Sequence, residues 1–363
     1  MNHIFSLLIS WMIMLVFIVV LATNVGLSSR VRNAGIKACI FMLIASFAES
    51  VSFGINGNES SILLHKIVKA IELSLTPIIP MIASCMFYKW NDDKKFKNIV
   101  FFFIAANVFA EIMSYSTNNL IFCIDERNNF SAGSFYFFYL AVNILSTTFF
   151  FVKAYKFSHL YQTGSNILLF SIAIFLVAGT SIQLIYPDIL VSWLVQSISL
   201  LLWYIFYNAT TMYVDKLTTL LNQPAYQNTL EKIGSDELFI ITFDVDDFKT
   251  VNDTYGHGLG DKVLRKIGKT LKKCYSPYGK VYRIGGDEFA VIIKRELSHD
   301  ELKKLNSNFT HLLEETRVSF PELPYVSYGA AFYTRSSTIK AVKEETDKNM
   351  YREKAFNKKQ RNS

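Results

Sequence analysis

The stretch RIGGDEFA, residues 283–290, sets two glycines and two carboxylates between apolar segments. Residues 281–284 and 289–293 are rich in β-branched and aromatic side chains, so they predict the two strands of a tight hairpin. We expect Gly285 and Gly286 to form the turn, with positive φ and an open backbone that a phosphate or sugar can approach. The adjacent Asp287 and Glu288 offer oxygen ligands to a hard cation. Taken alone, the stretch fits an exposed turn with solvated charges equally well.

A second acidic segment lies upstream and favours a binding site. The apolar run 238–245 predicts a buried strand whose end delivers Asp244 and Asp246. Ligands collect at strand ends in open α/β sheets. Residues 252–260 are typical of a loop that opens a helix near Asp261, where backbone N–H groups favour phosphate. Asn252 and Asp261 also have the donor and acceptor types that the edge of guanine needs.

These blocks resemble the GGDEF-domain family, the diguanylate cyclases that join two GTP into cyclic di-GMP. The resemblance covers roughly residues 215–358 and runs in order through DKLT (215–218), FDVD (243–246), NDTYGH (252–257), GD (260–261) and GGDEF (285–289). It implies that residues 214–363 form an α/β GGDEF domain with a central, mostly antiparallel sheet. The pattern predicts helices at 224–233, 259–273, 298–316 and 337–356, strands at 238–245 and 325–333, and a hairpin at 280–294.

Carried over position by position, the resemblance implies a role for each site residue. Asp244, Asp287 and the Val245 carbonyl would ligate Mg²⁺, at two ions per GTP site, with Mn²⁺ able to replace it. The implied catalytic residues are Asp287, Glu288, which would help activate the 3′-hydroxyl, and Lys249, which would neutralise the triphosphate. The implied substrate-binding residues are Asn252, Asp261, Gly285, Gly286, Lys354, Lys358 and His257. A structural hydrogen-bonding role is the alternative for His257, because it lies in a glycine-rich turn.

The chemistry implied by the family is attack of a 3′-oxygen on an α-phosphate, which two cations assist by stabilising the attacking and leaving oxygens. One domain binds one GTP, so we expect a homodimer with facing sites. The alternative is a catalytically inactive GGDEF-fold receptor or scaffold in a membrane signalling complex.

Three positions depart from the family pattern. Ser276 and Gly279 stand where many members have the Arg-x-x-Asp product-binding site, so we expect no strong product inhibition there. Residues 222–224 read Asn-Gln-Pro in place of Asn-Arg-Arg, which removes a second cation. Asn357 and Lys358 replace Gly-Arg, so the charge remains but the bidentate fork is lost.

Residues 1–213 have the composition of a membrane bundle. The first 214 residues hold 12 Lys+Arg and 9 Asp+Glu, against 25 and 21 in the remaining 149. Apolar runs of about 20 residues can cross a bilayer. We predict about seven transmembrane helices, at 4–25, 34–54, 70–89, 98–117, 135–155, 166–187 and 190–212. The first run has no cleavage site for a signal peptide, so we expect it to be retained.

Basic residues predict the sidedness of this bundle. They follow the first, third and fifth runs at 30–37, 89–97 and 153–156, while Lys66 and Lys69 are exceptions at the outer edge of the third run. The positive-inside rule then places the N-terminus outside and the cyclase domain in the cytoplasm, at the inner membrane of a bacterium. The net charge of +7 is explained by this asymmetry and by a triphosphate site, and no nucleic-acid motif is present.

Three carboxylates lie within the apolar runs: Glu49, Glu72 and Glu111. Ionisable groups are costly in a bilayer unless they face a cavity or a partner. Either they line a pocket for an unknown signal ligand, or they are packing and interfacial carboxylates. The sequence leaves both alternatives open.

Overall fold

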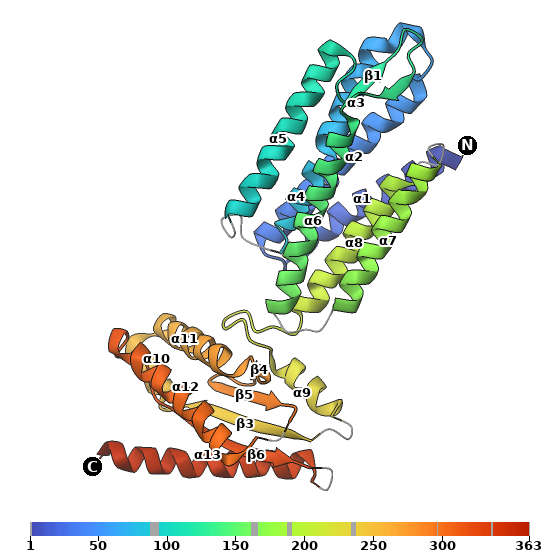
Figure 1. Cartoon of the computed structure of the whole chain (residues 1–363). Coiled ribbons are helices and arrows are strands. Elements are labelled where there is room, and N and C mark those ends of the chain that lie inside the picture. Colours follow the sequence, from blue (N-terminus) through green and yellow to red (C-terminus); the bar gives the residue numbers. More distant parts are fainter. Residues whose placement is uncertain are drawn as a thin grey trace. The chain divides into compact units, whose positions relative to one another are not determined.

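The computed structural model has two compact units, one formed by Met1–Leu160 with Gly164–Ala209 and the other containing Thr210–Ser363. The residues it describes are 2–87, 94–160, 166–186, 191–233, 237–295, 297–334 and 337–362. The first unit is mainly helical, and the second combines a sheet with helices (Figure 1).

The first unit contains the apolar helices that the sequence predicts. They are α1 (Asn2–Thr23), α2 (Ser29–Ile55), α3 (Ile62–Leu75), α4 (Ile78–Ser84), α5 (Lys94–Thr117), α6 (Tyr136–Leu160), α7 (Asn166–Ile185) and α8 (Ser192–Thr211). Among the described residues, 6 helical stretches are long and apolar enough to cross a membrane. Helix α8 fills the predicted seventh range but is not one of these, so the count of seven is approximate.

The third predicted range differs most from the structure. The membrane-length stretch is Glu59–Ser84, in which α3 and α4 are separate helices that meet at Pro77. Proline lacks the N–H that a continuous helix would need, which explains the break. The sequence predicted that Lys66 and Lys69 lie at the outer edge of the third run. In the structure both lysines lie within the stretch Glu59–Ser84. Lys89, used above for sidedness, lies outside the described residues.

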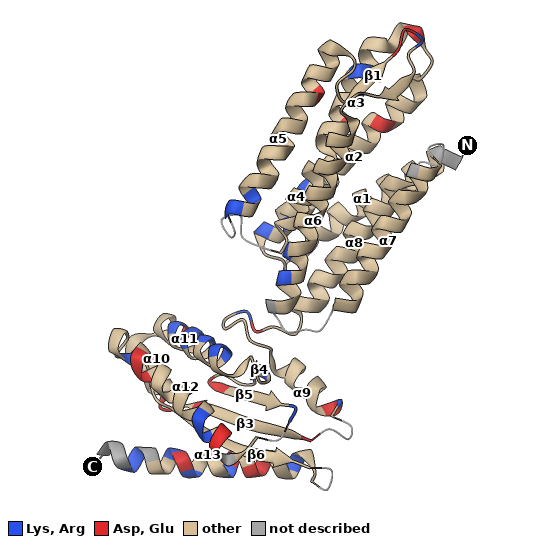
Figure 2. Ribbon diagram, viewed as in Figure 1, with Lys and Arg blue, Asp and Glu red and all other residues tan. Residues whose placement is uncertain are grey.

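Charged residues are unevenly distributed in the first unit. Figure 2 shows most of its Lys and Arg near one end, including the start of α5 and the last turns of α6. Between these helices lies a short hairpin that the sequence did not predict, with β1 (Phe122–Ile124) antiparallel to β2 (Phe130–Ala132). Its three-residue strands are too short to give a periodic pattern.

The three carboxylates have different surroundings. Glu49 accepts hydrogen bonds from the Trp193 indole and from Gln183. Glu72 is paired with Lys69 at 2.8 Å. Glu111 is fully buried, and neither of its oxygens has a hydrogen-bond partner among the described residues.

The second unit is built around a four-stranded sheet with the order β4-β5-β3-β6 and antiparallel neighbours. The strands are β3 (Leu238–Val245), β4 (Lys280–Arg283), β5 (Glu288–Ile293) and β6 (Val326–Tyr333). The helices are α9 (Gln223–Glu231), α10 (Phe248–Tyr255), α11 (His257–Tyr275), α12 (His299–Ser319) and α13 (Ile339–Asn362). The antiparallel α/β architecture predicted from the sequence is confirmed.

Each face of the sheet has its own core. Phe243 and Phe289 belong to the cluster that α11 and α12 cover. Ile240 and Ile292 belong to the opposite cluster, which α9 and α13 cover. Alternation along β3 and β5 sends neighbouring side chains to opposite faces, so both faces of these central strands are apolar. The charged side chains of these two strands, Asp244 and Glu288, therefore lie at the strand ends.

One predicted loop is helical. Residues 252–260 belong to α10 and α11, and α11 begins at His257 instead of near Asp261. Gly256, with φ +81°, is the break between the two helices. Phe248 and Val251 of α10 are partly buried against the core, which stabilises this short helix, while Gly258 and Gly260 lie in the first turn of α11.

Candidate active site

The end of β3 collects acidic side chains from distant parts of the chain. Asp244 is the register partner of Glu288 on β5 and of Ser327 on β6. Partners in an antiparallel ladder point to the same face and lie about 5 Å apart. Asp246 follows and is only 3% exposed, with its carboxylate accepting a hydrogen bond of 2.9 Å from Ser327 Oγ. The strand pairing confirms the predicted position of Asp244 at the end of β3.

The glycine hairpin next to this strand end has a different backbone from the one predicted. Neither Gly285 nor Gly286 has a φ in the left-handed region, so the expected positive φ is wrong. At Gly285 an added Cβ would lie 2.5 Å from Glu288 Oε2 and 3.2 Å from Glu288 Cβ, so the Glu288 side chain would have to move. At Gly286 an added Cβ would meet nothing within 4 Å, which confirms the expected open backbone there.

The hairpin is held in place from two sides. Glu288 O accepts hydrogen bonds from the N–H groups of Ile284 (2.9 Å) and Gly285 (3.3 Å). The Asp287 carbonyl accepts the Val245 N–H at 3.2 Å, which joins the turn to the end of β3. Arg283 donates to Gly286 O at 2.7 Å and also pairs with Asp215 at 3.1 Å. The two acidic hairpin residues are thus fixed beside Asp244.

Helix α13 brings a cation to the same strand end. Lys354 Nζ contacts the Asp244 carboxylate and lies 3.9 Å from Asp246 Oδ1. Partial burial lowers the pKa of Lys354, but the hydrogen bond to Asp244 and the nearby carboxylates outweigh it and raise the pKa above its usual value. Lys354 therefore stays charged in this position, as the predicted contact with phosphate requires.

Glu353 is a residue of this site that sequence reasoning missed. Its carboxylate accepts the backbone N–H of Tyr328 on β6. Burial, together with the charge of Asp246, raises the pKa of Glu353 to about 7. The only signal in the sequence is that Glu353 directly precedes Lys354 on a polar helix, which is too common a pattern to single it out.

Glu288 lies in a negative environment although its side chain is exposed. Partial burial and the charges of Asp244, Asp287 and Asp347 raise its pKa above the usual value. Glu288 and Asp347 also line a cavity of about 220 Å³ between α9, α13 and the sheet. The Thr242 hydroxyl in the wall of this cavity is buried without a hydrogen-bond partner in the described part of the chain. Asp347 is a second neighbour that the sequence did not identify.

The donor set is suited to a hard cation. Asp244, Asp287 and the Val245 carbonyl present oxygen atoms, which Mg²⁺ prefers, and the Lys354 ammonium already holds positive charge at Asp244. Within the described ranges, no three His, Cys, Asp or Glu side chains form a ready-made metal cluster. The chemistry of the donors fits Mg²⁺, while the ligands are only partly assembled.

The predicted guanine-binding residues lie on α10 and α11. Asn252 packs against Gly260, where an added Cβ would lie 2.0 Å from Asn252 Oδ1. This contact brings Asn252 beside the turn of α11 that carries Asp261. Asp261 is half exposed and lies 3.6 Å from Arg265. His257, the first residue of α11, is exposed.

Two predicted phosphate-binding lysines lie apart from the acidic cluster. Lys249 is exposed on α10 and Lys358 is exposed near the end of α13. No described contact joins either of them to Asp244, whereas Lys354 makes that contact. The structure therefore brings together the acidic residues and Lys354, and leaves the other cations on the surface.

Known proteins share this domain. Residues 212–360 match the family described as "Diguanylate cyclase, GGDEF domain". The chain is 35% identical over 152 residues to a probable diguanylate cyclase, DgcI, of Escherichia coli (strain K12), covering 42% of this chain and 33% of that protein. An uncharacterized membrane protein of Staphylococcus epidermidis is 32% identical over 146 residues, covering 37% of this chain and 41% of that protein.

The chain thus matches only about a third to two fifths of the length of these relatives. One similar solved structure is that of the coiled coil and GGDEF domain of DgcB from Caulobacter crescentus in complex with c-di-GMP. The two chains are 26% identical with a TM-score of 0.36, and the match covers 43% of this chain and 87% of that chain. Residues 212–360 are a GGDEF domain, with homologues among the diguanylate cyclases.

Proposed function

We propose that this protein is a membrane-bound diguanylate cyclase that condenses two GTP into cyclic di-GMP and two pyrophosphates. The observation that carries the proposal is the register pairing of Asp244 with Glu288, beside a hairpin whose Asp287 is tied to the end of β3. This arrangement gathers acidic groups next to an open backbone at Gly286. A nucleotide triphosphate with its cations is the ligand class that such a site suits.

Each side chain has a defined part in this proposal. Mg²⁺, or Mn²⁺ in its place, supplies electrostatic stabilisation of the phosphoryl oxygens when bound by Asp244, Asp287 and the Val245 carbonyl. Glu288, whose pKa is raised by partial burial and by its acidic neighbours, accepts the proton of the attacking 3′-hydroxyl. Lys354 donates to phosphate oxygens from its place beside Asp244.

The remaining residues bind and orient the substrate. Asn252 and Asp261 hydrogen-bond the guanine, and the open backbone at Gly286 with Gly285 admits the ribose and the α-phosphate. Lys249, Lys358 and His257 complete the substrate-binding set, with Lys249 neutralising the triphosphate as it binds.

The catalytic unit in this proposal is a homodimer, because each domain holds one GTP and two must meet for two phosphodiester bonds to form. The helical unit lies in the inner membrane of a bacterium, with the N-terminus outside and the GGDEF domain in the cytoplasm. The gathering of Lys and Arg near one end of that unit supports this orientation (Figure 2). An unknown signal ligand sensed by the helical unit would control output.

The second candidate is an inactive GGDEF-fold receptor or scaffold in a membrane signalling complex. What favours it is that the metal ligands are only partly assembled and that Lys358 replaces an arginine. A receptor would bind nucleotide without turning it over, so turnover separates the two candidates.

The test is turnover of GTP by the full chain purified in detergent, with Mg²⁺ and with the product identified. We expect cyclic di-GMP from the wild type and none above background from Glu288→Gln. Glu344→Gln is the matched control, because Glu344 is exposed on α13 and has no assigned role. GTP binding without turnover in the wild type would support the receptor, and undiminished turnover by Glu288→Gln would refute the assigned role of Glu288.

A further inference from the structure

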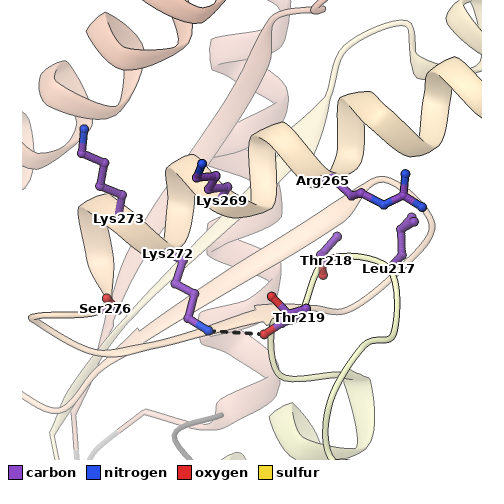
Figure 3. A pocket seen from close by; sticks show the side chains of 8 residues that line it. All are labelled: Leu217, Thr218, Thr219, Arg265, Lys269, Lys272, Lys273 and Ser276. Atoms are coloured by element: carbon purple, nitrogen blue, oxygen red, sulfur yellow. Dashed lines mark hydrogen bonds between the residues drawn. The ribbon is translucent and has the colours of Figure 1, made fainter. Parts of the chain in front are cut away.

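Two groups of like charge lie outside the candidate active site. One is a hollow of about 440 Å³ on the GGDEF domain, lined in part by four basic residues of α11: Arg265, Lys269, Lys272 and Lys273 (Figure 3). Three of these side chains are exposed, so water solvates their charge. The other group is in the helical unit, where the carboxylates of Glu72 and Glu111 are buried. Burial removes water, so these charges need a partner.

Glu111 is the carboxylate whose partner the chain does not supply. It lies on α5 and is fully buried, and neither of its oxygens accepts a hydrogen bond within the described residues. The charged side chain that acts on it is Glu72 of α3, which is also acidic. Glu72 is already paired with Lys69 at 2.8 Å. A buried carboxylate in this position is costly unless a cation or a proton neutralises it.

Asn107 adds a further acceptor oxygen one turn away. It lies four residues before Glu111 on α5, so the two side chains project from the same face of the helix. Its amide nitrogen donates a hydrogen bond of 3.4 Å to the Leu73 carbonyl, which shows that this face points at α3. Its Oδ1 oxygen is buried and has no donor in the described part of the chain. Three acceptor oxygens without a donor therefore lie on this face of α5.

Aromatic residues lie next to these oxygens. Tyr136 and Tyr139 of α6, whose ring centroids are 5.4 Å apart, belong to the same apolar cluster as Ala110, the residue before Glu111. Leu73 is also a member of this cluster. Tyr136 lies within electrostatic range of Glu111. The acceptor oxygens thus border on aromatic rings, which attract cations through their π-electrons.

The helical unit already holds one ammonium in such surroundings. Lys69 Nζ pairs with the Glu72 carboxylate and lies 4.5 Å from the centre of the Phe130 ring on β2. A carboxylate and an aromatic ring together are therefore what this unit uses to stabilise a half-buried ammonium. Glu111 and Asn107 offer the same combination to a second ammonium, one that does not come from a side chain of the described residues.

We propose that Glu111 and Asn107 bind a small organic cation with a primary ammonium group. Its N–H groups would donate to the Glu111 carboxylate and to Asn107 Oδ1, and its carbon atoms would pack against the tyrosine rings. The cation must be small, because Glu111 is fully buried. A metal ion suits the position less, since no three His, Cys, Asp or Glu side chains form a metal cluster within the described ranges.

The hairpin end of the unit is the side from which this cation would enter. Ser114, one turn beyond Glu111, accepts a hydrogen bond of 2.6 Å from the Ile121 N–H, directly before β1. The end of α5 therefore lies against the hairpin. This inference names the chemistry of the signal ligand in the function proposed above, and it rests on that function only for an effect on cyclase output. Binding itself can be measured without GTP.

The experiment measures the midpoint of thermal unfolding of the full chain in detergent, without GTP. The probes are methylammonium, ethylammonium and propylammonium chloride, each titrated singly. Sodium chloride and tetramethylammonium chloride at equal ionic strength are the controls, because their cations carry no N–H donor. We expect at least one primary ammonium to raise the midpoint as its concentration rises, since a ligand that binds only the folded state stabilises it. No rise with any of the three, or an equal rise with the control salts, would overturn the proposal.

Two variants test whether the effect comes from this site. Glu111→Gln keeps the shape of the side chain and should raise the required probe concentration roughly tenfold, because a charge-assisted hydrogen bond is lost. Glu59→Gln removes the same charge from an exposed position in the 3₁₀ helix Glu59–Ser61 and should change little. Equal effects in the two variants would refute the site.

Hydrogen exchange of the wild type gives a second readout that needs no variant. The effective ammonium should protect amides of α3 and α5, and protection confined to other helices would contradict the proposal. Ammonium binding by a chain that does not turn over GTP would leave this inference standing and refute the cyclase. Turnover of GTP by a chain that binds no ammonium would do the reverse.

Discussion

Gly329→Ala should displace α13 from β6 and disturb the acidic end of the sheet. A Cβ on Gly329 would lie 2.0 Å from Thr346 O and 2.4 Å from Met350 N, both of them backbone atoms that cannot rotate away. Ordinary contact begins near 3.4 Å, so the helix must retreat on the order of 1 Å. Overpacking of this kind costs about 1–3 kcal/mol. Lys354 lies one turn beyond Met350, and its contact with Asp244 moves with the helix.

The assay is hydrogen exchange of α13 in the full chain, followed by GTP turnover. Amide exchange in α13 should rise roughly 5- to 150-fold, as the lost stability dictates. Turnover should fall by about 100-fold, because a misplacement near 1 Å at a reacting group has that effect. Gly258→Ala is the control, since an added Cβ there meets nothing within 4 Å. Unchanged exchange in α13 of Gly329→Ala would refute the close approach.

Three further predictions concern single sites. The pKa of Glu353 is raised from 4.5 to about 7, so the stability it contributes is present below pH 4.5 and lost as the pH rises through 7. In the wild type, the free energy that protects the α13 amides from hydrogen exchange should fall over that pH range. Glu353→Gln should reduce this fall by about 1 kcal/mol, after allowance for solvent screening. An unchanged pH profile would contradict this prediction. Progress curves with and without added cyclic di-GMP should nearly overlay, because Ser276 and Gly279 cannot supply an Arg–Asp pair; inhibition at low product would show another site. If the buried Glu111 carboxyl couples the helical unit to cyclase output, Glu111→Gln should change the cellular cyclic di-GMP concentration roughly 5- to 150-fold at equal expression. A concentration equal to that of the wild type would show that Glu111 has only a structural role.

The sequence predicted the elements whose pattern is local. Strand β3 was predicted with its observed bounds, because an apolar run of 8 residues is short for a helix and this one is rich in β-branched and aromatic side chains. The segment 252–260 was misread as a loop because of its glycines, whereas Gly256 only separates α10 from α11, and Gly258 and Gly260 lie in the first turn of α11. Pro77 was visible in the sequence, but the predicted range 70–89 ran across it, whereas the structure has separate helices on its two sides.

The site was predictable only where a motif is contiguous. Asp244, Asp287 and Glu288 follow from strand ends and the hairpin, and the register confirms that Asp244 and Glu288 face each other. Glu353 could not be found, because its partner Tyr328 lies 25 residues away on a strand that α13 covers. The positive φ expected at Gly285 was wrong, because glycine permits a left-handed backbone but does not impose one.

The acidic end of the sheet holds more negative charge than its own cation balances. Lys354 contacts Asp244 and lies near Asp246, while Glu288 and Glu353 remain in the field of other carboxylates. Burial raises the pKa values of both glutamates, and neighbouring carboxylates raise them further. An added positive charge at this edge would reverse the second effect, so cation binding and proton release from Glu288 are thermodynamically linked. A bound cation therefore keeps Glu288 ionised and free to take up a proton, although the same cation makes Glu288 a weaker base.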